Sequence, residues 1–233
     1  MSQPTLPVVV VGSGLAGLTS VYKLLERKIP VILIDKMDKM GGNSIKASSG
    51  INGVLTSTQK QFGIEDSVQG FFEDTKKSGG KIGDLNLQQK LVKESTEAIR
   101  WLQQDIGVPL DLVNRLGGHS QRRTHRSSNI PPGFEIISKL KNKIVEHEEN
   151  LKLLLNSQIV DIDISNGKII GLKVLDLINK HEDYIKTNQI VMATGGFGFS
   201  EELIKKYRPD QINNFRIHQK NKTIKQFTQN KNG

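Results

Sequence analysis

The stretch VVVVGSGLAGL, residues 8–18, contains the pattern that decides the fold. Its four consecutive valines are typical of a strand that is buried on both faces of a sheet. They are followed by Gly12-x-Gly14-x-x-Gly17 and then by apolar residues at helical spacing. In such a unit the first glycine permits the turn, the second lets the backbone approach a pyrophosphate, and the third lets helix and strand pack closely. The stretch therefore predicts the start of a dinucleotide-binding α/β domain.

A second strand and an acidic residue follow at the distance that this fold requires. Residues 30–35 read PVILID, which places Asp35 eighteen positions after Gly17. A carboxylate at about this distance reaches the ribose hydroxyls of a dinucleotide. The glycine pattern alone can occur by chance in a loop, but the strand, the helix and the acid together favour the dinucleotide site. No arginine lies near Asp35, which argues against a ribose that carries a 2′-phosphate.

The residues after Asp35 favour a flavin over a nicotinamide, a choice that the glycine pattern cannot make. Residues 35–53 read DKMDKMGGNSIKASSGING. Their small residues let the main chain lie against a bulky flat ligand, and Asn43 and Ser44 can form hydrogen bonds with it. A nicotinamide-binding protein normally begins a helix at this point, and glycines weaken a helix.

Two amphipathic helices are predicted in the middle of the chain. Asp84 is a typical N-cap, and the long helix that follows it ends before Gly107. Trp101 is predicted to be a half-buried packing residue beside the inward face of that helix. The second helix is predicted from Phe134 to about Glu148. The inward face of the first helix is predicted to consist of Leu87, Leu91, Val92, Ser95, Ile99 and Leu102.

A basic segment, RLGGHSQRRTHRSSNIPPG at residues 115–133, is predicted to be a loop between these helices. It contains two histidines, but a metal site is disfavoured because no carboxylate supports them and the neighbouring arginines would repel a metal ion. Two interpretations remain open. The segment is either a solvated basic loop or a cationic lip near the flavin that attracts a dicarboxylate, since guanidinium groups pair with carboxylates. The second interpretation makes His125 and Arg126 the candidate catalytic residues.

The chain changes to a β pattern after Leu151. Asn166-Gly167 separates two alternating segments, which is a strong signal for a hairpin. We predict an antiparallel meander over about residues 151–189, after which residues 190–193 return to the parallel sheet. The segment VMATGGFGFS, residues 191–200, then supplies a strand and a glycine turn.

Composition limits the remaining possibilities. The 233 residues include no cysteine, which excludes disulfides, thiolate metal sites and cysteine nucleophiles. No apolar run approaches the roughly 18–20 residues of a membrane helix, and the first motif leaves no room for a leader. The chain is therefore predicted to be cytoplasmic and without a membrane partner, although a mitochondrial location is not excluded.

The net charge of +9 is concentrated at the end of the chain. Residues 211–233 hold five cations and no acid, which leaves +4 for residues 1–210. This tail is rich in Asn, Gln and Lys and is predicted to be disordered. Aromatic interleaving and an amphipathic pattern are both missing from it, so neither a nucleic-acid partner nor a membrane tether is favoured.

Five motifs resemble, in order, those of the soluble fumarate reductase flavoproteins. They are VVVVGSGLAGL, DKMDKMGGNS, ASSGING, RLGGHSQRRTHRSS and VMATGGFGFS, and the resemblance extends over residues 8–210. It implies a Rossmann-like, α/β FAD-binding domain at residues 1–210 with a central parallel sheet, an antiparallel β-meander and flanking helices. It also implies reduction of fumarate to succinate by hydride transfer from the flavin. The motifs name no electron donor.

The resemblance also assigns cofactor contacts residue by residue. It implies that FAD is bound by Gly12, Ser13, Gly14, Ala16, Gly17, Asp35, Lys36, Gly42, Asn43, Ser44, Ser49, Gly50, Val160, Ala193, Thr194 and Gly195. In this family Val160 would present its backbone to the adenine side of the cofactor. Asp35 stands where many members of the family have glutamate.

The family's proton-donating arginine and the residues that clamp the substrate carboxylates would fall after residue 210. The resemblance therefore implies that the capping domain and the C-terminal half are absent. Two alternatives to a working fumarate reductase follow. One is a truncated, catalytically impaired remnant or the product of a broken gene. The other is a related flavin oxidoreductase that acts on a different substrate.

Overall fold

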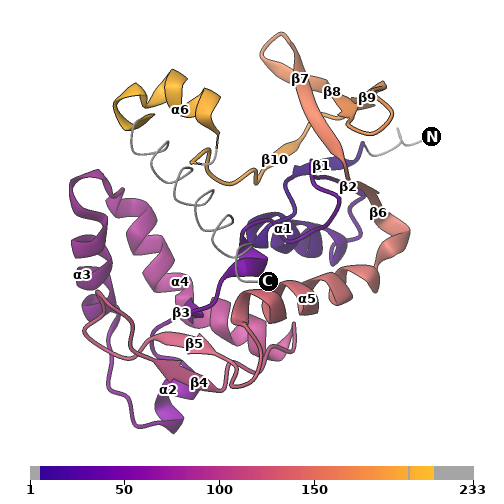
Figure 1. Ribbon diagram of the computed structural model, residues 1–233. Coiled ribbons are helices and arrows are strands. Elements are labelled where there is room, and N and C mark those ends of the chain that lie inside the picture. The colour runs from indigo at the N-terminus through magenta and orange to yellow at the C-terminus, as the bar shows by residue number, and fades with distance from the viewer. Residues whose placement is uncertain (1–5, 199, 213–233) are drawn as a thin grey trace, which may run out of the picture. The chain divides into compact units, whose positions relative to one another are not determined.

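The computed structural model describes residues 6–198 and 200–212, which form two compact units divided after Thr194. The centre of the first unit is a four-stranded parallel sheet in the order β10-β1-β2-β6 (Figure 1). Val9 is in register with Ile32 on one side and with Ile190 on the other. The strands are β1 (Val8–Val11), β2 (Val31–Ile34), β6 (Leu151–Leu154) and β10 (Ile190–Met192).

The prediction that the meander begins near residue 151 is wrong. Residues 151–154 form β6, which pairs in parallel with β2. The expected return of the chain to the parallel sheet is confirmed, since Val191 of β10 is in register with Val10 of β1. A four-residue apolar segment looks alike in a parallel and an antiparallel sheet, so its pattern could not distinguish them.

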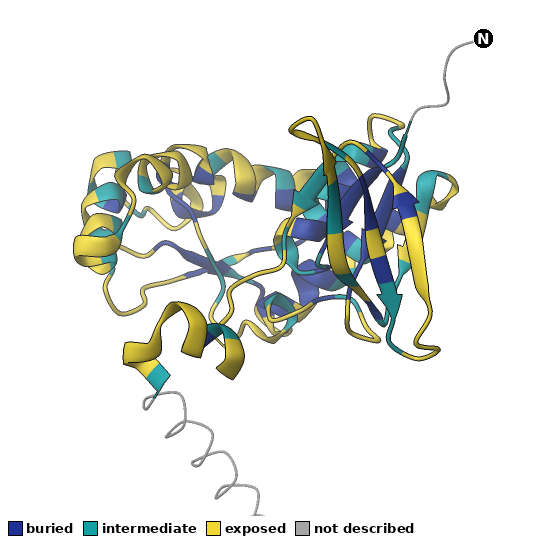
Figure 2. Cartoon of the chain, turned by 90° about the horizontal axis from the view of Figure 1, so that it is seen from above, coloured by how far each residue is buried: buried dark blue, intermediate teal, exposed yellow. Residues whose placement is uncertain are grey.

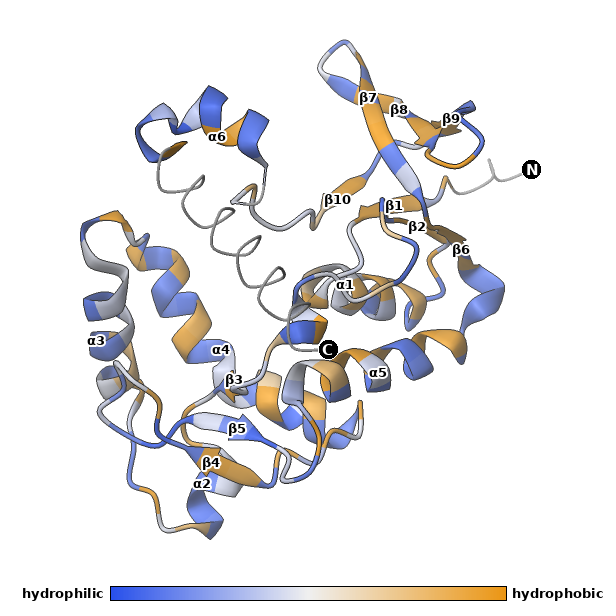
Figure 3. Cartoon of the chain, viewed as in Figure 1, coloured by the Kyte–Doolittle hydropathy of each residue, from blue (hydrophilic) through white to orange (hydrophobic). Residues whose placement is uncertain are grey.

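Each face of the parallel sheet is covered by a different layer. Helices α1 (Leu15–Leu25) and α5 (Pro132–Val145) cover one face, where Leu18, Val21 and Leu140 are fully buried. Figure 2 shows that buried residues concentrate in these strands and in the elements that pack on them. Figure 3 shows β1 and β2 as apolar strands and α5 as a helix with alternating apolar and polar positions, as expected for one buried face.

The antiparallel meander covers the other face. It consists of β7 (Ser157–Ser165), β8 (Lys168–Asp176) and β9 (Glu182–Lys186). Both Asn166 and Gly167 have positive φ, 51° and 71°, as the tight hairpin turn requires. Leu172, Val174 and Ile185 pack against the apolar side chains of β1 and β2.

A third layer of short strands and helices follows β2 in the sequence. It contains α2 (Ser57–Gln61), α3 (Val68–Gly79), α4 (Leu85–Gln104) and the antiparallel sheet β3-β5-β4, with β3 at Ile51–Asn52, β4 at Leu112–Asn114 and β5 at Thr124–Arg126. Single 3₁₀ turns lie at η1 (Ser44–Lys46), η2 (Gly80–Ile82) and η3 (Glu148–Asn150). Asp84 caps α4 as predicted, because its carboxylate accepts from the N–H groups of Asn86 and Leu87.

Three predictions for this region need correction. Leu87 and Leu91 are 68% and 55% exposed, whereas the other four predicted residues of the inward face of α4 are buried: Val92, Ser95, Ile99 and Leu102. The helix predicted from Phe134 to about Glu148 occupies residues 132–145. The basic segment 115–133 is a loop only in part, because residues 124–126 form the central strand β5.

The second unit contains α6 (Glu201–Tyr207) and η4 (Pro209–Gln211). The hydroxyl of Ser200 caps α6 by accepting from the N–H of Leu203 at 3.3 Å. Of the predicted basic tail, only Gln211 and Ile212 lie within the described residues. Across the described part of the chain, no helix combines the length and the apolar character needed to cross a membrane.

Candidate functional site: a dinucleotide cradle

The glycine turn after β1 is shaped by close contacts within the protein. Gly12 has a φ of +98°, and a Cβ atom there would lie 2.4 Å from the carbonyl oxygen of Ala193. A Cβ atom on Gly17 would lie 1.8 Å from the carbonyl oxygen of Gly12. Such distances are far inside van der Waals contact, so the first and third glycines are required by the packing of α1 on β1 and β10.

Gly14 differs, because the protein's own packing does not require a glycine there. Its φ of −71° suits any residue, and an added Cβ atom would meet only the Ser44 hydroxyl, at 3.4 Å. A Cβ atom on Gly42 would approach Gly14 Cα no closer than 3.4 Å. These two glycines therefore leave the backbone at the start of α1 uncovered, which is the surface that a pyrophosphate needs.

The start of α1 has the electrostatic properties of an anion site. The hydroxyl of Ser44 accepts from the N–H of Leu15 at 3.0 Å. Within the described residues, no hydrogen bond reaches the N–H groups of Gly14 and Ala16. Free N–H groups and the positive end of the helix dipole favour the binding of a phosphate.

Asp35 lies at the carboxyl end of β2 and points back to the glycine turn. Its Oδ2 atom accepts from the backbone N–H of Ser13 at 2.7 Å and from the Ser13 hydroxyl at 2.5 Å. Its Oδ1 atom accepts from the N–H of Met37 at 2.9 Å. The predicted ribose-binding acid is therefore held beside the predicted pyrophosphate-binding turn, as the dinucleotide fold requires.

The other predicted cofactor contacts lie on several elements. Lys36, Asn43 and Ser49 are exposed. Gly50 has a φ of +135°, and a Cβ atom there would lie 2.3 Å from the carbonyl oxygen of His125, so β5 packs against its backbone. The contacts of Lys36, Asn43, Ser49 and Gly50 with FAD stay predictions.

The remaining predicted contacts come from the C-terminal part of the chain. Val160 is 43% exposed and is skipped by the pairing of β7 with β8, which passes from Ile159 to Asp161. Such a bulge frees a residue from the ladder and is common beside binding sites. Ala193 donates its N–H to Val11 at 2.8 Å and is followed by the exposed Thr194. Gly195, with a φ of +73°, begins the second unit.

The basic segment 115–133 is a solvated loop only in part, because residues 115–118, 120–122 and 128–131 are exposed whereas residues 123–125 and 127 are buried. His125 is fully buried in β5; its Nδ1 atom lies 2.7 Å from the carbonyl oxygen of Arg123 and its Nε2 atom lies 2.7 Å from the Thr56 hydroxyl. A backbone carbonyl can only accept, so Nδ1 carries the proton and Nε2 accepts from Thr56. Arg126 is partly buried, and its Nε atom donates to the carbonyl oxygen of Ser127 at 3.4 Å.

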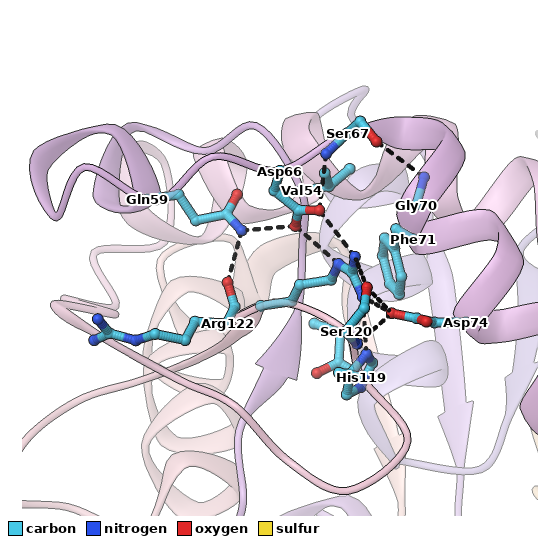
Figure 4. Close-up of polar contacts among 12 residues, drawn as sticks. Val54, Gln59, Asp66, Ser67, Gly70, Phe71, Asp74, His119, Ser120 and Arg122 are labelled. Atoms are coloured by element: carbon cyan, nitrogen blue, oxygen red, sulfur yellow. Dashed lines mark hydrogen bonds and ion pairs between the residues drawn. The ribbon is translucent and has the colours of Figure 1, made fainter.

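A buried ion-pair network that no sequence pattern predicted includes Asp66 and Asp74 (Figure 4), and both carboxylates pair with Arg123. Arg123 is fully buried and makes a bidentate contact with Asp66, through Nε and Nη2 at 2.8 Å each. Its Nη1 atom also pairs with Asp74 of α3. Burial opposes ionisation, but hydrogen bonds from Ser120 and Arg123 lower the pKa of Asp74 to about 2. The partners are 57 and 49 positions away, so no local pattern could have revealed them.

One local signal for this region was available in the sequence. Thr56 and Gln59 form a capping box at the start of α2, in which the Thr56 hydroxyl accepts from the N–H of Gln59. The spacing Thr-x-x-Gln is typical of this motif. In the described ranges, no group of three His, Cys, Asp or Glu side chains could hold a metal ion.

His125 predicts a loss of stability in mild acid. Burial lowers the pKa of His125 below the usual histidine value of about 6.5, against the opposing effect of its backbone hydrogen bonds. Below pH 6.5 the unfolded chain therefore binds more protons than the folded one, and stability falls as the pH is lowered, by at most about 1.4 kcal/mol per pH unit for this histidine. Burial also lowers the pKa of His119, which acts in the same direction. Urea unfolding at pH 7.5 and 5.5 measures the change.

The control for this prediction is His125→Gln, which cannot gain a proton. This variant is expected to be less stable than the wild type at pH 7.5 but to lose less stability on acidification. An unchanged pH dependence in the variant would contradict the assignment of His125.

The glycine turn, the free helix start and the acid at the end of β2 together define a dinucleotide-binding α/β domain. The chain belongs to the FAD-binding domain family, whose sequence profile matches residues 7–222. FAD is the cofactor of this family. The residues present fit it: Gly14 and Gly42 leave room for a diphosphate at the start of α1, and Asp35 lies beside them.

The chain is similar in sequence or structure to three known reductases. It is 46% identical over 213 residues to fumarate reductase 1 of Saccharomyces cerevisiae, a match that covers 89% of this chain and 45% of the yeast protein. It is 33% identical to urocanate reductase of Eggerthella lenta, covering 87% of this chain and 34% of that protein. The open conformation of a flavocytochrome c3 fumarate reductase superposes with a TM-score of 0.80 at 34% identity, covering 89% of this chain and 36% of that one. The chain thus spans less than half the length of these relatives.

Proposed function

We propose that this chain is the cofactor-binding part of a FAD-dependent oxidoreductase that reduces fumarate to succinate. The observation that carries the proposal is the convergence of the uncovered helix start, the Ser44 hydroxyl and the Asp35 carboxylate on one turn. The similarity to the yeast fumarate reductase supports the choice of substrate. When bound, FAD supplies the hydride for this reduction.

The residues of the chain bind and orient the cofactor in this proposal. The N–H groups of Gly14 and Ala16 hold the diphosphate, and Asp35 accepts a hydrogen bond from the adenosine ribose. The segment after Asp35 contains five further residues proposed to contact FAD: Gly42, Asn43, Ser44, Ser49 and Gly50. At Gly50 the main chain packs closely on β5. The bulged Val160 supplies free backbone groups for the adenine.

A related reductase with another substrate is the main alternative for the reaction. The similarity to a urocanate reductase supports it, because that protein matches nearly the same share of this chain. Both fumarate and urocanate carry a carboxylate beside a carbon–carbon double bond. Arg126 is the candidate for attracting such a carboxylate, because Arg123 is already paired with two aspartates.

A second candidate function is the binding of FAD without turnover by this polypeptide alone. It is favoured by the surroundings of His125, whose ring nitrogens both have partners inside the protein. A general acid or base needs a nitrogen within hydrogen-bond reach of the substrate.

Anaerobic reoxidation of the bound flavin tests these candidates. The protein is incubated with FAD, freed of excess by gel filtration, reduced, and mixed with fumarate or urocanate while the absorbance of oxidised flavin is followed. We expect flavin to remain bound and to be reoxidised faster by fumarate than by urocanate. Faster reoxidation by urocanate would show that urocanate, and not fumarate, is the better substrate. Bound flavin that neither compound reoxidises would support the second candidate function. Failure of the protein to retain flavin would contradict both candidate functions.

A further inference from the structure

The carboxylate of Asp35 is already largely occupied by hydrogen bonds from the protein. A carboxylate offers about four acceptor positions, two on each oxygen. Oδ2 accepts two hydrogen bonds, from the N–H and from the hydroxyl of Ser13. Oδ1 accepts one, from the N–H of Met37. One acceptor position is therefore left, and it is on Oδ1.

Ser13 is placed to hold the carboxylate and not to contact a ligand. It is fully buried, and both of its donors point to Asp35. Its hydroxyl and its carbonyl oxygen also accept from the N–H of Gly41, at 3.3 Å and 2.9 Å. Ser13 thus connects three parts of the cradle: the glycine turn, the acid at the end of β2, and the glycine pair that precedes Ser44.

We infer that Ser13 is a positioning residue that fills Oδ2 of Asp35 and thereby restricts the acid to one ribose hydroxyl, bound by Oδ1. The inference rests on the proposed binding of FAD at this cradle. It revises the expectation that Ser13 contacts FAD, because its N–H and hydroxyl both donate to Asp35. A carboxylate free on both oxygens accepts from the 2′ and 3′ hydroxyls together, whereas this carboxylate accepts from one of them.

Two FAD analogues test the inference in the wild-type protein. One lacks the 2′ hydroxyl of the adenosine ribose and the other lacks the 3′ hydroxyl. Dissociation constants for FAD and both analogues are measured by titration of the apoprotein, followed by flavin fluorescence. We expect one analogue to bind about tenfold or more weakly than FAD, since hydrogen bonds to charged groups have this strength. The other analogue is expected to bind within about twofold of FAD, because no acceptor remains for its missing hydroxyl.

The variant Ser13→Ala tests the role of Ser13 itself. It removes the hydroxyl donor and leaves the backbone donor, so Oδ2 gains one acceptor position. The analogue that the wild type tolerates is then expected to bind several-fold more weakly than FAD. Ser95→Ala is the matched control: Ser95 is also buried, accepts from Val54 N–H at 3.2 Å and donates to the Val92 carbonyl at 2.8 Å. This control is expected to leave both analogue ratios unchanged.

The outcomes separate this inference from the proposed function. If FAD itself fails to bind, the proposed function fails. If FAD binds and both analogues are weakened equally, or neither is weakened, the single-hydroxyl assignment is overturned while the FAD site stands. If Ser13→Ala keeps the wild-type ratios, the role of Ser13 is overturned. If that variant does not fold, Ser13→Cys replaces it, because a thiol is a weaker donor of similar size.

Discussion

Gly17→Ala is expected to destabilise the first unit strongly. The new Cβ atom would lie 1.8 Å from the carbonyl oxygen of Gly12 and 2.9 Å from its carbonyl carbon. Both atoms belong to the backbone, so helix α1 would have to move away from β1 and lose the packing of Leu18 and Val21. Overpacking of a well-packed core costs about 1–3 kcal/mol and occasionally more, and native proteins have only about 5–15 kcal/mol in total. Circular dichroism and urea unfolding measure the loss.

Gly14→Ala is the matched variant in the same turn, and we expect it to weaken FAD binding and not the stability of the fold. Its backbone angles suit alanine, and its Cβ atom would make an ordinary contact with Ser44. Stability should therefore change little, while the methyl group occupies the space that a diphosphate needs. We expect FAD to bind about 10- to 100-fold more weakly, which corresponds to the cost of overpacking. Equal FAD affinity in Gly14→Ala and the wild type would show that the diphosphate lies elsewhere.

Arg123→Ala is expected to destabilise the protein by about 3–5 kcal/mol, because it breaks a buried ion pair and leaves an uncompensated charge. Asp66 would be that charge, since its side chain is 1% exposed, and Asp74 would lose the same partner. Arg123→Lys keeps the charge but cannot make the bidentate contact, so we expect an intermediate loss. Urea unfolding of the three proteins at pH 7.5 gives the order.

Arg100→Ala is the control for this series. Arg100 pairs with Glu97 on the surface of α4, where both side chains are about half exposed or more. Exposed pairs of this kind contribute little, so no measurable change in the unfolding midpoint is expected. If Arg123→Ala were as stable as Arg100→Ala, the network in Figure 4 would have no role in the stability of the third layer.

The first crossover could be predicted almost completely from the sequence. The β1 strand, the glycine turn, α1, β2 and Asp35 lie within about thirty consecutive residues, and each is specified by a local pattern: a valine run, three spaced glycines and an acid at the end of a strand. The cap of α4 at Asp84 and the hairpin at Asn166-Gly167 were predictable for the same reason, since a cap and a tight turn depend on neighbours two to four positions away.

Apart from the bounds of α5, the errors concern how segments pack against the rest of the fold. Local pattern could not show that residues 151–154 pair in parallel with β2, that residues 124–126 enter a sheet, or that Leu87 and Leu91 lie outside the buried stripe of α4. Arg123 is the clearest case. In the sequence it is one of several arginines in a basic segment, whereas in the fold it is the buried partner of two aspartates.

The sequence by itself determined the class of fold and the glycine turn of the predicted cofactor cradle, because glycine spacing and apolar strand runs are properties of short segments. Only the tertiary structure decided which polar groups of that cradle remain available to a ligand. Ser13 and Asp35 are 22 positions apart, and their hydrogen bonds form only when β1 and β2 are adjacent in the sheet. The number of free acceptor positions on Asp35 is therefore a property of the folded chain, since hydrogen bonds between distant segments are set by packing.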